Sequence, residues 1–170
     1  MHSKLSLKKN IESILTHNSL SLSTLSRPKF NEELDKLFVE SGWQRQPAVF
    51  NEGDEAFAKM DFLKDRIGIE VEFGHASFIG IDLLKFQVSS YSSLDKIDLG
   101  VYVTTTSRFQ KTLAKDHSLN WEGSLSFEKV CRYLPLLKSA IQVPVGNNMK
   151  VEGIPMSDIG CQFQWYGISK

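Results

Sequence analysis

Three acidic side chains lie in or beside one apolar strand in the segment MDFLKDRIGIEVEFGH: Asp61, Glu70 and Glu72. Glu70 and Glu72 are two residues apart, so on a strand both side chains leave the same face. If the chain turns at Lys64 to Arg66, Asp61 on the outgoing strand comes to lie beside Glu70 on the returning one. Like charges this close would raise at least one carboxyl pKa or destabilise the hairpin unless a cation shares them.

A hard divalent cation would relieve this repulsion. Mg²⁺ prefers oxygen ligands and commonly takes one or two carboxylates together with water and phosphate oxygens, and Mn²⁺ is expected to substitute for it. The backbone carbonyl of Val71 would supply a further oxygen. The alternative is a solvated sheet face, with both glutamates paired to neighbouring basic side chains (Lys59, Lys64 or Arg66).

The elements that must position these acids alternate between strand and helix patterns. Residues 67–73 alternate apolar side chains with Gly and Glu, which predicts a half-buried strand after the turn. The period then changes, and residues 76–90 place Phe78, Ile81, Leu84 and Val88 on one helical stripe. The segment KIDLGVYVTTT, rich in β-branched residues, predicts a second strong strand.

The remaining chain supplies flanking elements. A helix is predicted from about residue 30, with Asn31 as its N-cap and Gly42 ending it, after an N-terminal helical arm and linker (about 1–26). Towards the C-terminus we expect a helix interrupted at Pro135, strands within residues 141–154, and a last strand near 161–168. The sequence therefore predicts a single α/β domain over residues 1–170, with a mixed sheet flanked by helices.

Composition restricts the class of protein. The chain has 170 residues, 41% of them hydrophobic, which is typical of a globular domain with a sizeable core. No apolar run approaches the length of a membrane span, so no membrane partner is expected. Cys131 and Cys161 have no metal-type spacing, and an intracellular, cytoplasmic protein is expected. The net charge of +0 neither supports nor excludes nucleic acid as a partner.

The pattern of Asp61, FLKDRIGI, Glu70, Val71 and Glu72, followed by a helix and KIDLGVYV, resembles the BglII-like type II restriction endonucleases, a branch of the PD-(D/E)xK nucleases. The resemblance extends over residues 30–102 and implies a restriction-endonuclease-like core. It implies that Asp61 and Glu70 coordinate metal, assisted by the Val71 carbonyl. Glu72 occupies the third catalytic position, where the general fold has Lys, BglII-like members have Gln, and the BamHI type has Glu.

The resemblance leaves the role of Glu72 open between a general base, a second metal ligand and a residue that positions water. An auxiliary acid on the helix before the hairpin is also expected, at Glu40 or Glu33. The alternative for either residue is a solvated helix charge.

Five residues are predicted to contact DNA: His75, Ser77, Lys85, Thr105 and Arg108. The first two directly follow the acidic strand, where polar residues of the resembling enzymes approach DNA. Lys85 lies on the next helix and suits a phosphate, while Thr105 and Arg108 follow the second strand, where hydroxyl and guanidinium groups suit phosphates and base edges. Solvated side chains and a plain polar loop are the alternatives.

The function implied is that of a Mg²⁺-dependent type II restriction endonuclease, which cuts double-stranded DNA at a short palindrome. The resemblance implies a GATC-centred site, a homodimer with a helical interface, and a cognate DNA methyltransferase as genetic partner. One alternative is a non-catalytic DNA-binding or protein-interaction module with an exposed acidic hairpin. The other is a nuclease of the same fold with relaxed specificity.

Overall fold

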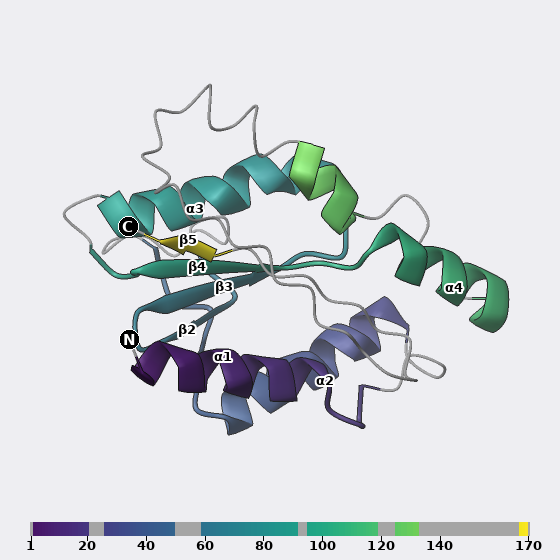
Figure 1. Cartoon of the computed structure of the whole chain (residues 1–170), viewed down its shortest axis with the longest axis horizontal. Helices are drawn as coiled ribbons and strands as arrows, with labels where there is room; N and C mark the ends of the chain where they lie inside the picture. Colours follow the sequence, from purple (N-terminus) through teal and green to yellow (C-terminus); the bar gives the residue numbers. More distant parts are fainter. Residues whose placement is uncertain are drawn as a thin grey trace.

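A mixed five-stranded sheet lies at the centre of the computed structural model, which describes residues 2–20, 26–49, 59–91, 95–118, 125–132 and 167–169 (Figure 1). The strands lie side by side in chain order: β1 (Gln44–Arg45), β2 (Phe62–Lys64), β3 (Ile67–Val71), β4 (Leu99–Val103) and β5 (Gly167–Ser169). β3 and β4 are parallel, and the other neighbouring pairs are antiparallel. The predicted α/β class with a mixed sheet is confirmed.

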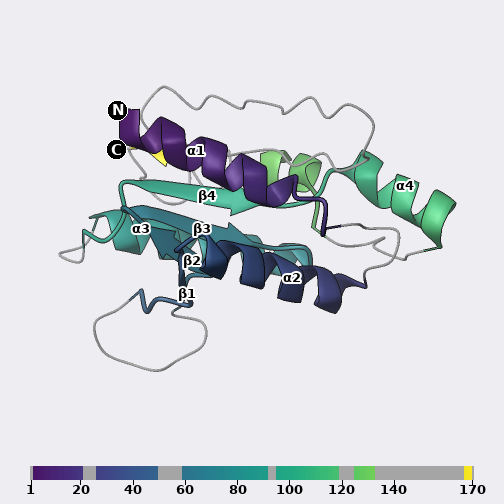
Figure 2. The ribbon, with the colours of Figure 1, turned by 90° about the horizontal axis from the view of Figure 1, so that it is seen from below.

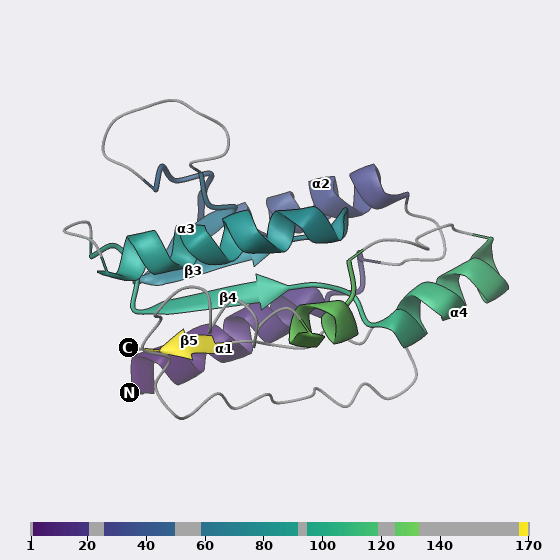
Figure 3. The same ribbon diagram turned by 90° about the horizontal axis from the view of Figure 1, so that it is seen from above.

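Helices cover both faces of the sheet. α1 (His2–Leu15) and α2 (Arg27–Glu40) pack side by side on one face (Figure 2), whereas the short helix η2 (Ala76–Phe78) and α3 (Ile79–Tyr91) cover the other (Figure 3). α3 makes the crossover that two parallel strands require. In the described ranges, the helices all fall short of the length and apolarity needed to cross a bilayer.

The core has one apolar layer on each face of the sheet, because side chains alternate along the strands. Val101 and Val103 of β4 pack with α1 and α2, whereas Tyr102 between them faces α3. The N-terminal segment predicted as an arm is part of this core. α1 buries Leu7, Ile11, Ile14 and Leu15 in the layer beneath the sheet.

α2 begins earlier than predicted. Ser26, not Asn31, occupies the N-cap position, and Pro28 lies in the first turn. A proline is tolerated there because the first N–H groups of a helix have no intrahelical partner. The predicted end is confirmed, since Gly42 follows the C-cap with a φ of +80°.

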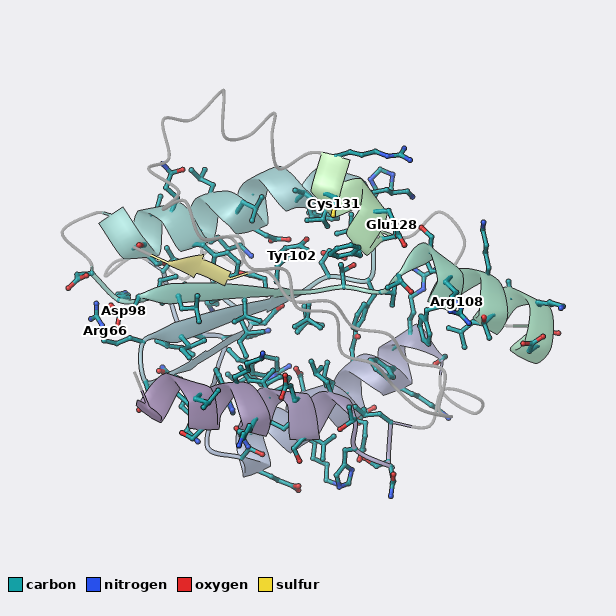
Figure 4. The ribbon with its side chains drawn as sticks, in the orientation of Figure 1. Arg66, Asp98, Tyr102, Arg108, Glu128 and Cys131 are labelled. Atoms are coloured by element: carbon teal, nitrogen blue, oxygen red, sulfur yellow. The ribbon has the colours of Figure 1, made fainter. Side chains whose placement is uncertain are left out.

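The hairpin that carries the acids has the predicted turn. Lys64 pairs with Ile67, so Asp65 and Arg66 form a two-residue loop, with φ values of 45° and 64°. Positive φ at both positions is the type I′ geometry that matches strand twist. Arg66 is held by Asp95 and Asp98 from the segment before β4 (Figure 4), with Nη2 2.9 Å and 2.8 Å from their carboxylates.

Two paired glycines leave room for side chains that pack on the sheet, and one of them lies against α3. Gly68 and Gly100 are register partners in β3 and β4. A Cβ at Gly100 would lie 2.6 Å from the ring of Phe86 in α3, and one at Gly68 would meet the side chain of Met60. The missing side chain at Gly100 therefore lets α3 approach β4, whereas the one at Gly68 makes room for Met60.

α4 (Ser107–His117) follows β4 in a region where no helix was predicted and a plain polar loop was one alternative. Its N-cap is Thr106, whose hydroxyl accepts a hydrogen bond from the Phe109 amide at 3.1 Å. The predicted helix over residues 126–141 is observed as residues 127–132, and its continuation through Pro135 lies outside the described residues. The strands predicted within 141–154 lie outside them as well, whereas β5 forms at the end of the last predicted strand.

Candidate active site

Glu70 and Glu72 lie at the C-terminal end of β3, on the face covered by α3. Glu70 is the register partner of Tyr102, which places it on the Tyr102 side of the sheet, and Glu72 follows two residues later. Asp61 immediately precedes β2, and its Oδ2 accepts a hydrogen bond from the Val71 amide at 2.7 Å. The hairpin thus brings Asp61 beside Glu70, as the turn predicted.

Lys85 of α3 reaches into this cluster of acids. Its Nζ lies 3.1 Å from both carboxylate oxygens of Glu70 and 3.0 Å from Asp82 Oδ1. The other oxygen of Asp82 accepts a hydrogen bond from Tyr102 Oη at 3.0 Å, and Tyr102 lies between α3 and the sheet (Figure 4). Lys85 was predicted to contact DNA phosphate, but here its ammonium is already paired with two carboxylates.

Asp82 and Tyr102 were not among the predicted site residues. Asp82 and Lys85 are three residues apart, a spacing that places two side chains on one helix face. Tyr102 alternates with two core valines, which puts it on the opposite side of β4. Both signals are present in the sequence, but only the packing of α3 against β4 shows that the two side chains meet.

The acids of this cluster hold their protons more tightly than exposed carboxyls. Burial, together with the nearby Asp61 carboxylate, raises the pKa of Glu70 to about 9. Burial also raises the pKa of Asp61 and of Glu72. Burial alone would lower the pKa of Lys85, but the charges of Glu70 and Asp82 outweigh it and raise that pKa. The site therefore favours a bound proton or cation, because its carboxyl groups outnumber the ammonium of Lys85.

The donor atoms fit a small hard cation held by two carboxylates. Glu70 is only 3% exposed, and both of its oxygens share the single ammonium of Lys85, which Asp82 also contacts. No cluster of three or more His, Cys, Asp or Glu side chains arranged for a metal occurs within the described part of the chain. Mg²⁺ does not need one, since it retains water and takes substrate phosphate oxygens alongside one or two carboxylates. Asp61 and Glu70 meet that requirement.

Glu72 is half-buried and turns back on its own chain. Its Oε1 accepts a hydrogen bond from the Gly74 amide, and the charges of Asp82 and Asp61 add to burial in raising its pKa. The contact fixes one carboxylate oxygen close to its own backbone. This geometry is compatible with each of the three roles expected for Glu72.

The predicted auxiliary acid lies apart from this cluster. Glu40 is exposed at the C-terminal end of α2. The α2 acid whose charge acts on Asp61 is Asp35, which pairs with Arg45 Nη2 at 2.6 Å. Sequence reasoning missed Asp35 because α2 carries several acidic residues. Only the packing of α2 against the hairpin shows which of them lies near Asp61.

His75 and Ser77 lie on the exposed surface after β3. His75 is the N-cap of η2, and its Nδ1 accepts a hydrogen bond from the Ser77 amide at 3.3 Å. The Ser77 hydroxyl is 3.0 Å from the same nitrogen. The pair therefore has a local structural role, and both side chains remain at the surface.

Thr105 and Arg108 have opposite environments, although both were predicted to contact DNA. Thr105 is 1% exposed, donates to the Leu125 carbonyl at 3.3 Å and accepts from Gln110 Nε2 at 2.9 Å. This placement argues against a DNA contact, because the hydroxyl is used inside the fold. Arg108 is exposed in the first turn of α4 (Figure 4).

Comparison with known proteins bears on the identity of this site. Residues 1–146 match the family model described as "Restriction endonuclease BglII/BglIII". Comparisons with curated proteins and with solved structures gave no match. The match covers most of the 170 residues, including the acidic hairpin, α3 and β4. The chain belongs to the BglII/BglIII restriction endonuclease family and is a type II site-specific deoxyribonuclease.

Proposed function

We propose that this endonuclease cuts both strands of a short palindromic, GATC-centred site in a Mg²⁺-dependent reaction centred on Asp61, Glu70 and Glu72. The observation that carries the proposal is the buried carboxylate of Glu70, which lies beside Asp61 and shares the ammonium of Lys85 with Asp82. Buried acids that outnumber their cationic partners are costly, and such groups concentrate at functional sites. A purely structural hairpin would gain nothing from this arrangement.

The roles of the residues follow from their positions. Asp61, Glu70 and the Val71 carbonyl would hold the metal, which supplies Lewis-acid stabilisation of phosphate charge and a more acidic bound water. Mn²⁺ is expected to replace Mg²⁺ because it accepts the same ligands. Glu72, fixed through the Gly74 amide, would orient the attacking water in line with the departing 3′-oxygen. Val71 is itself oriented by the hydrogen bond from its amide to Asp61.

Exposed polar residues near the ends of β3 and β4 would contact the duplex. His75 and Ser77 lie just after β3, and Arg108 lies in α4 just after β4. The strands are parallel, so both ends lie at the same edge of the sheet as the acids. Arg108 can pair bidentately with guanine or bind phosphate, whereas Lys85 and Thr105 serve the interior of the fold.

A homodimer would place two such sites on the two strands of a palindrome. The apolar stripe of α3 supports this part of the proposal. Phe78, Ile81 and Leu84 are between 45% and 48% exposed, whereas Ile79, Asp82 and Phe86 face the sheet. Adjacent exposed apolar side chains on one helix are typical of an interface. A cytoplasmic location and a cognate methyltransferase fit an enzyme that would otherwise cut its own host's DNA.

Plasmid digestion tests the proposal directly. Wild-type protein should produce discrete fragments in Mg²⁺ or Mn²⁺ and none in EDTA. The variants Asp61→Ala and Glu70→Ala should lose about 10³-fold or more in cleavage rate, because the metal contributes several kcal/mol of transition-state stabilisation, while still binding duplex DNA. Glu32→Gln, at an exposed position of α2, is the matched control and should cut normally.

The pattern of products separates the alternatives. Sequencing the fragment ends should identify a palindrome containing GATC. A smear would indicate a nuclease with relaxed specificity, and intact plasmid with unaltered DNA binding would favour the non-catalytic module. Cutting by Asp61→Ala at the wild-type rate would contradict the assigned site.

A further inference from the structure

A lysine from α3 supplies the positive charge within the acidic site, although the strand position next to the acids carries Glu72. Lys85 Nζ lies 3.1 Å from Glu70 and 3.0 Å from Asp82, and its side chain is 14% exposed. Glu70 and Asp82 are themselves buried. An ammonium held in two short ion pairs inside a fold is unlike the solvated lysines of a protein surface.

The fold holds this lysine in a defined place. Asp82 is one helical turn before Lys85, and its second oxygen accepts from Tyr102 Oη. Tyr102 is 1% exposed and is the register partner of Glu70. The chain of contacts runs from Tyr102 through Asp82 and Lys85 to Glu70, and so returns to the neighbouring strand. Tyr102, Asp82 and Glu70 are buried and Lys85 is half-buried, so these contacts hold the ammonium in a defined place.

We propose that Lys85 is a positioning residue for Glu70. It also serves as the counter-ion of the acidic cluster in metal-free protein, a role that a bound divalent cation partly replaces. The inference deepens the proposed function and rests on Asp61 and Glu70 as the metal site. Lys85 fixes the Glu70 carboxylate because its Nζ lies 3.1 Å from both carboxylate oxygens. Asp82 and Tyr102 position Lys85.

The charges of this cluster predict the effect of removing Lys85. Asp61, Glu70 and Asp82 bring three carboxylates against the single ammonium of Lys85. Removing Lys85 makes the cluster more negative, so the metal-free protein should become less stable and the site should attract a divalent cation more strongly. The cleavage rate should fall at the same time, because Glu70 loses the contact that orients it. General damage to the fold would weaken metal binding and cleavage together.

The first experiment uses metal-free protein and measures melting temperature. Lys85→Met is expected to lower it by roughly 3–8 °C, because it leaves buried carboxylates unpaired. Adding Glu70→Gln to that variant should recover most of the loss, and Lys85→Arg should lose little. The control is Lys96→Met, which removes a lysine whose Nζ contacts the Ala48 carbonyl at 3.0 Å. A double variant that melts at or below Lys85→Met would overturn the inference.

The second experiment adds Mn²⁺ and measures its binding by calorimetry, together with the cleavage rate at saturating metal. Lys85→Met should bind Mn²⁺ about tenfold more tightly than the wild type. The same variant should cut DNA at least tenfold more slowly. Tyr102→Phe should slow cleavage with a smaller change in affinity. If Lys85→Met binds Mn²⁺ no more tightly than the wild type, Lys85 does not act as the counter-ion of the site.

The two experiments separate this inference from the proposed function. If the wild type cuts DNA with Mg²⁺ but Glu70→Gln does not rescue Lys85→Met, only the inference fails. If the wild type neither cuts nor binds Mn²⁺ while the rescue is observed, the proposed metal site fails and the pairing of Lys85 with Glu70 stands.

Discussion

Glu70 is the least exposed acid of the site, and its ion pair with Lys85 does not offset its burial. It is 3% exposed, and the Asp61 carboxylate adds to the effect of burial, so its pKa rises to about 9. Lys85 opposes this shift without cancelling it. When ionised, such a side chain destabilises the folded, metal-free protein. A bound cation would remove that cost, as expected for a preformed cation site.

This strain should appear as a pH dependence of stability in metal-free protein. Because the folded-state pKa of Glu70 is raised above the unfolded value near 4.5, the folded state binds more protons between that pH and about 9. Stability should therefore fall as pH rises through this window, by at most about 1.4 kcal/mol per pH unit for one group. Asp61 and Glu72 shift in the same direction.

Thermal melts at a series of pH values in EDTA measure this effect. Glu70→Gln should flatten the decline between pH 5 and pH 9, since the amide does not titrate. Glu32→Gln should follow the wild type. A Glu70→Gln profile as steep as that of the wild type would show that other groups cause the decline.

At the residue scale, the sequence predicted that the three acids lie close together, but it did not predict which other side chains contact them. The two-residue spacing and the turn were sufficient to bring Asp61, Glu70 and Glu72 to one site. Asp82 and Tyr102 join it through the docking of a helix on a strand, which no local pattern encodes. Thr105 shows the same limit, since its burial depends on Leu125, far along the chain.

At the scale of elements, the approach of α3 to the sheet decides whether Lys85 can reach Glu70. Gly100 is the contact that permits it, because any side chain there would meet the ring of Phe86. The pairing of Gly68 with Gly100 extends this small patch over two strands. The site therefore depends on residues that carry no functional group.

Gly100→Ala is expected to destabilise the protein by about 1–3 kcal/mol, the usual cost of overpacking a core, and to slow cleavage by moving α3. The matched control is Gly80→Ala in α3, where a Cβ would meet nothing within 4 Å. It should be neutral or stabilising by up to about 1 kcal/mol, because Ala favours helix more than Gly. Denaturant titration and plasmid cleavage measure both effects. Equal stability of the two variants would contradict this account.

The elements themselves were predictable where period and turn chemistry agree. The hairpin, α3 and β4 follow from alternation, a change of period and β-branched composition. α4 was not predicted, because its capping residues, Thr106 and Ser107, also suit a plain polar loop. The predicted stripe divides in the structure: Phe78, Ile81 and Leu84 are exposed, whereas Val88 packs against the core, and Ile79, Phe86 and the pair Asp82 and Lys85 face the sheet.

At the scale of the whole molecule, the exposed apolar side chains of η2 and α3 support the proposed dimer. Phe78 at the end of η2 and Ile81 and Leu84 in α3 are exposed, whereas Ile79 and Phe86 pack toward the sheet. An isologous contact through this stripe would bury the apolar side chains of both copies.

Ile81→Glu and Leu84→Glu should convert the dimer into a monomer, because each places two like charges across a two-fold interface. Light scattering after size exclusion measures the mass, and double-strand cutting should decline relative to nicking. Val39→Glu changes an exposed apolar residue of α2 on the opposite layer and should leave the mass unchanged. A monomeric wild-type protein, or dimeric Ile81→Glu and Leu84→Glu variants, would contradict this interface.

The clamp of Arg66 by Asp95 and Asp98 has a consequence for folding fidelity. A strand exposes alternate residues to its two faces, so a hairpin slipped by one residue would bury Ile69 or Val71 beneath α3 and turn both glutamates toward α1 and α2. Such a product would be compact yet chemically inert. Arg66 ties the tip of the hairpin to the segment that leads into β4. This contact would favour the strand register that places both glutamates in the active site.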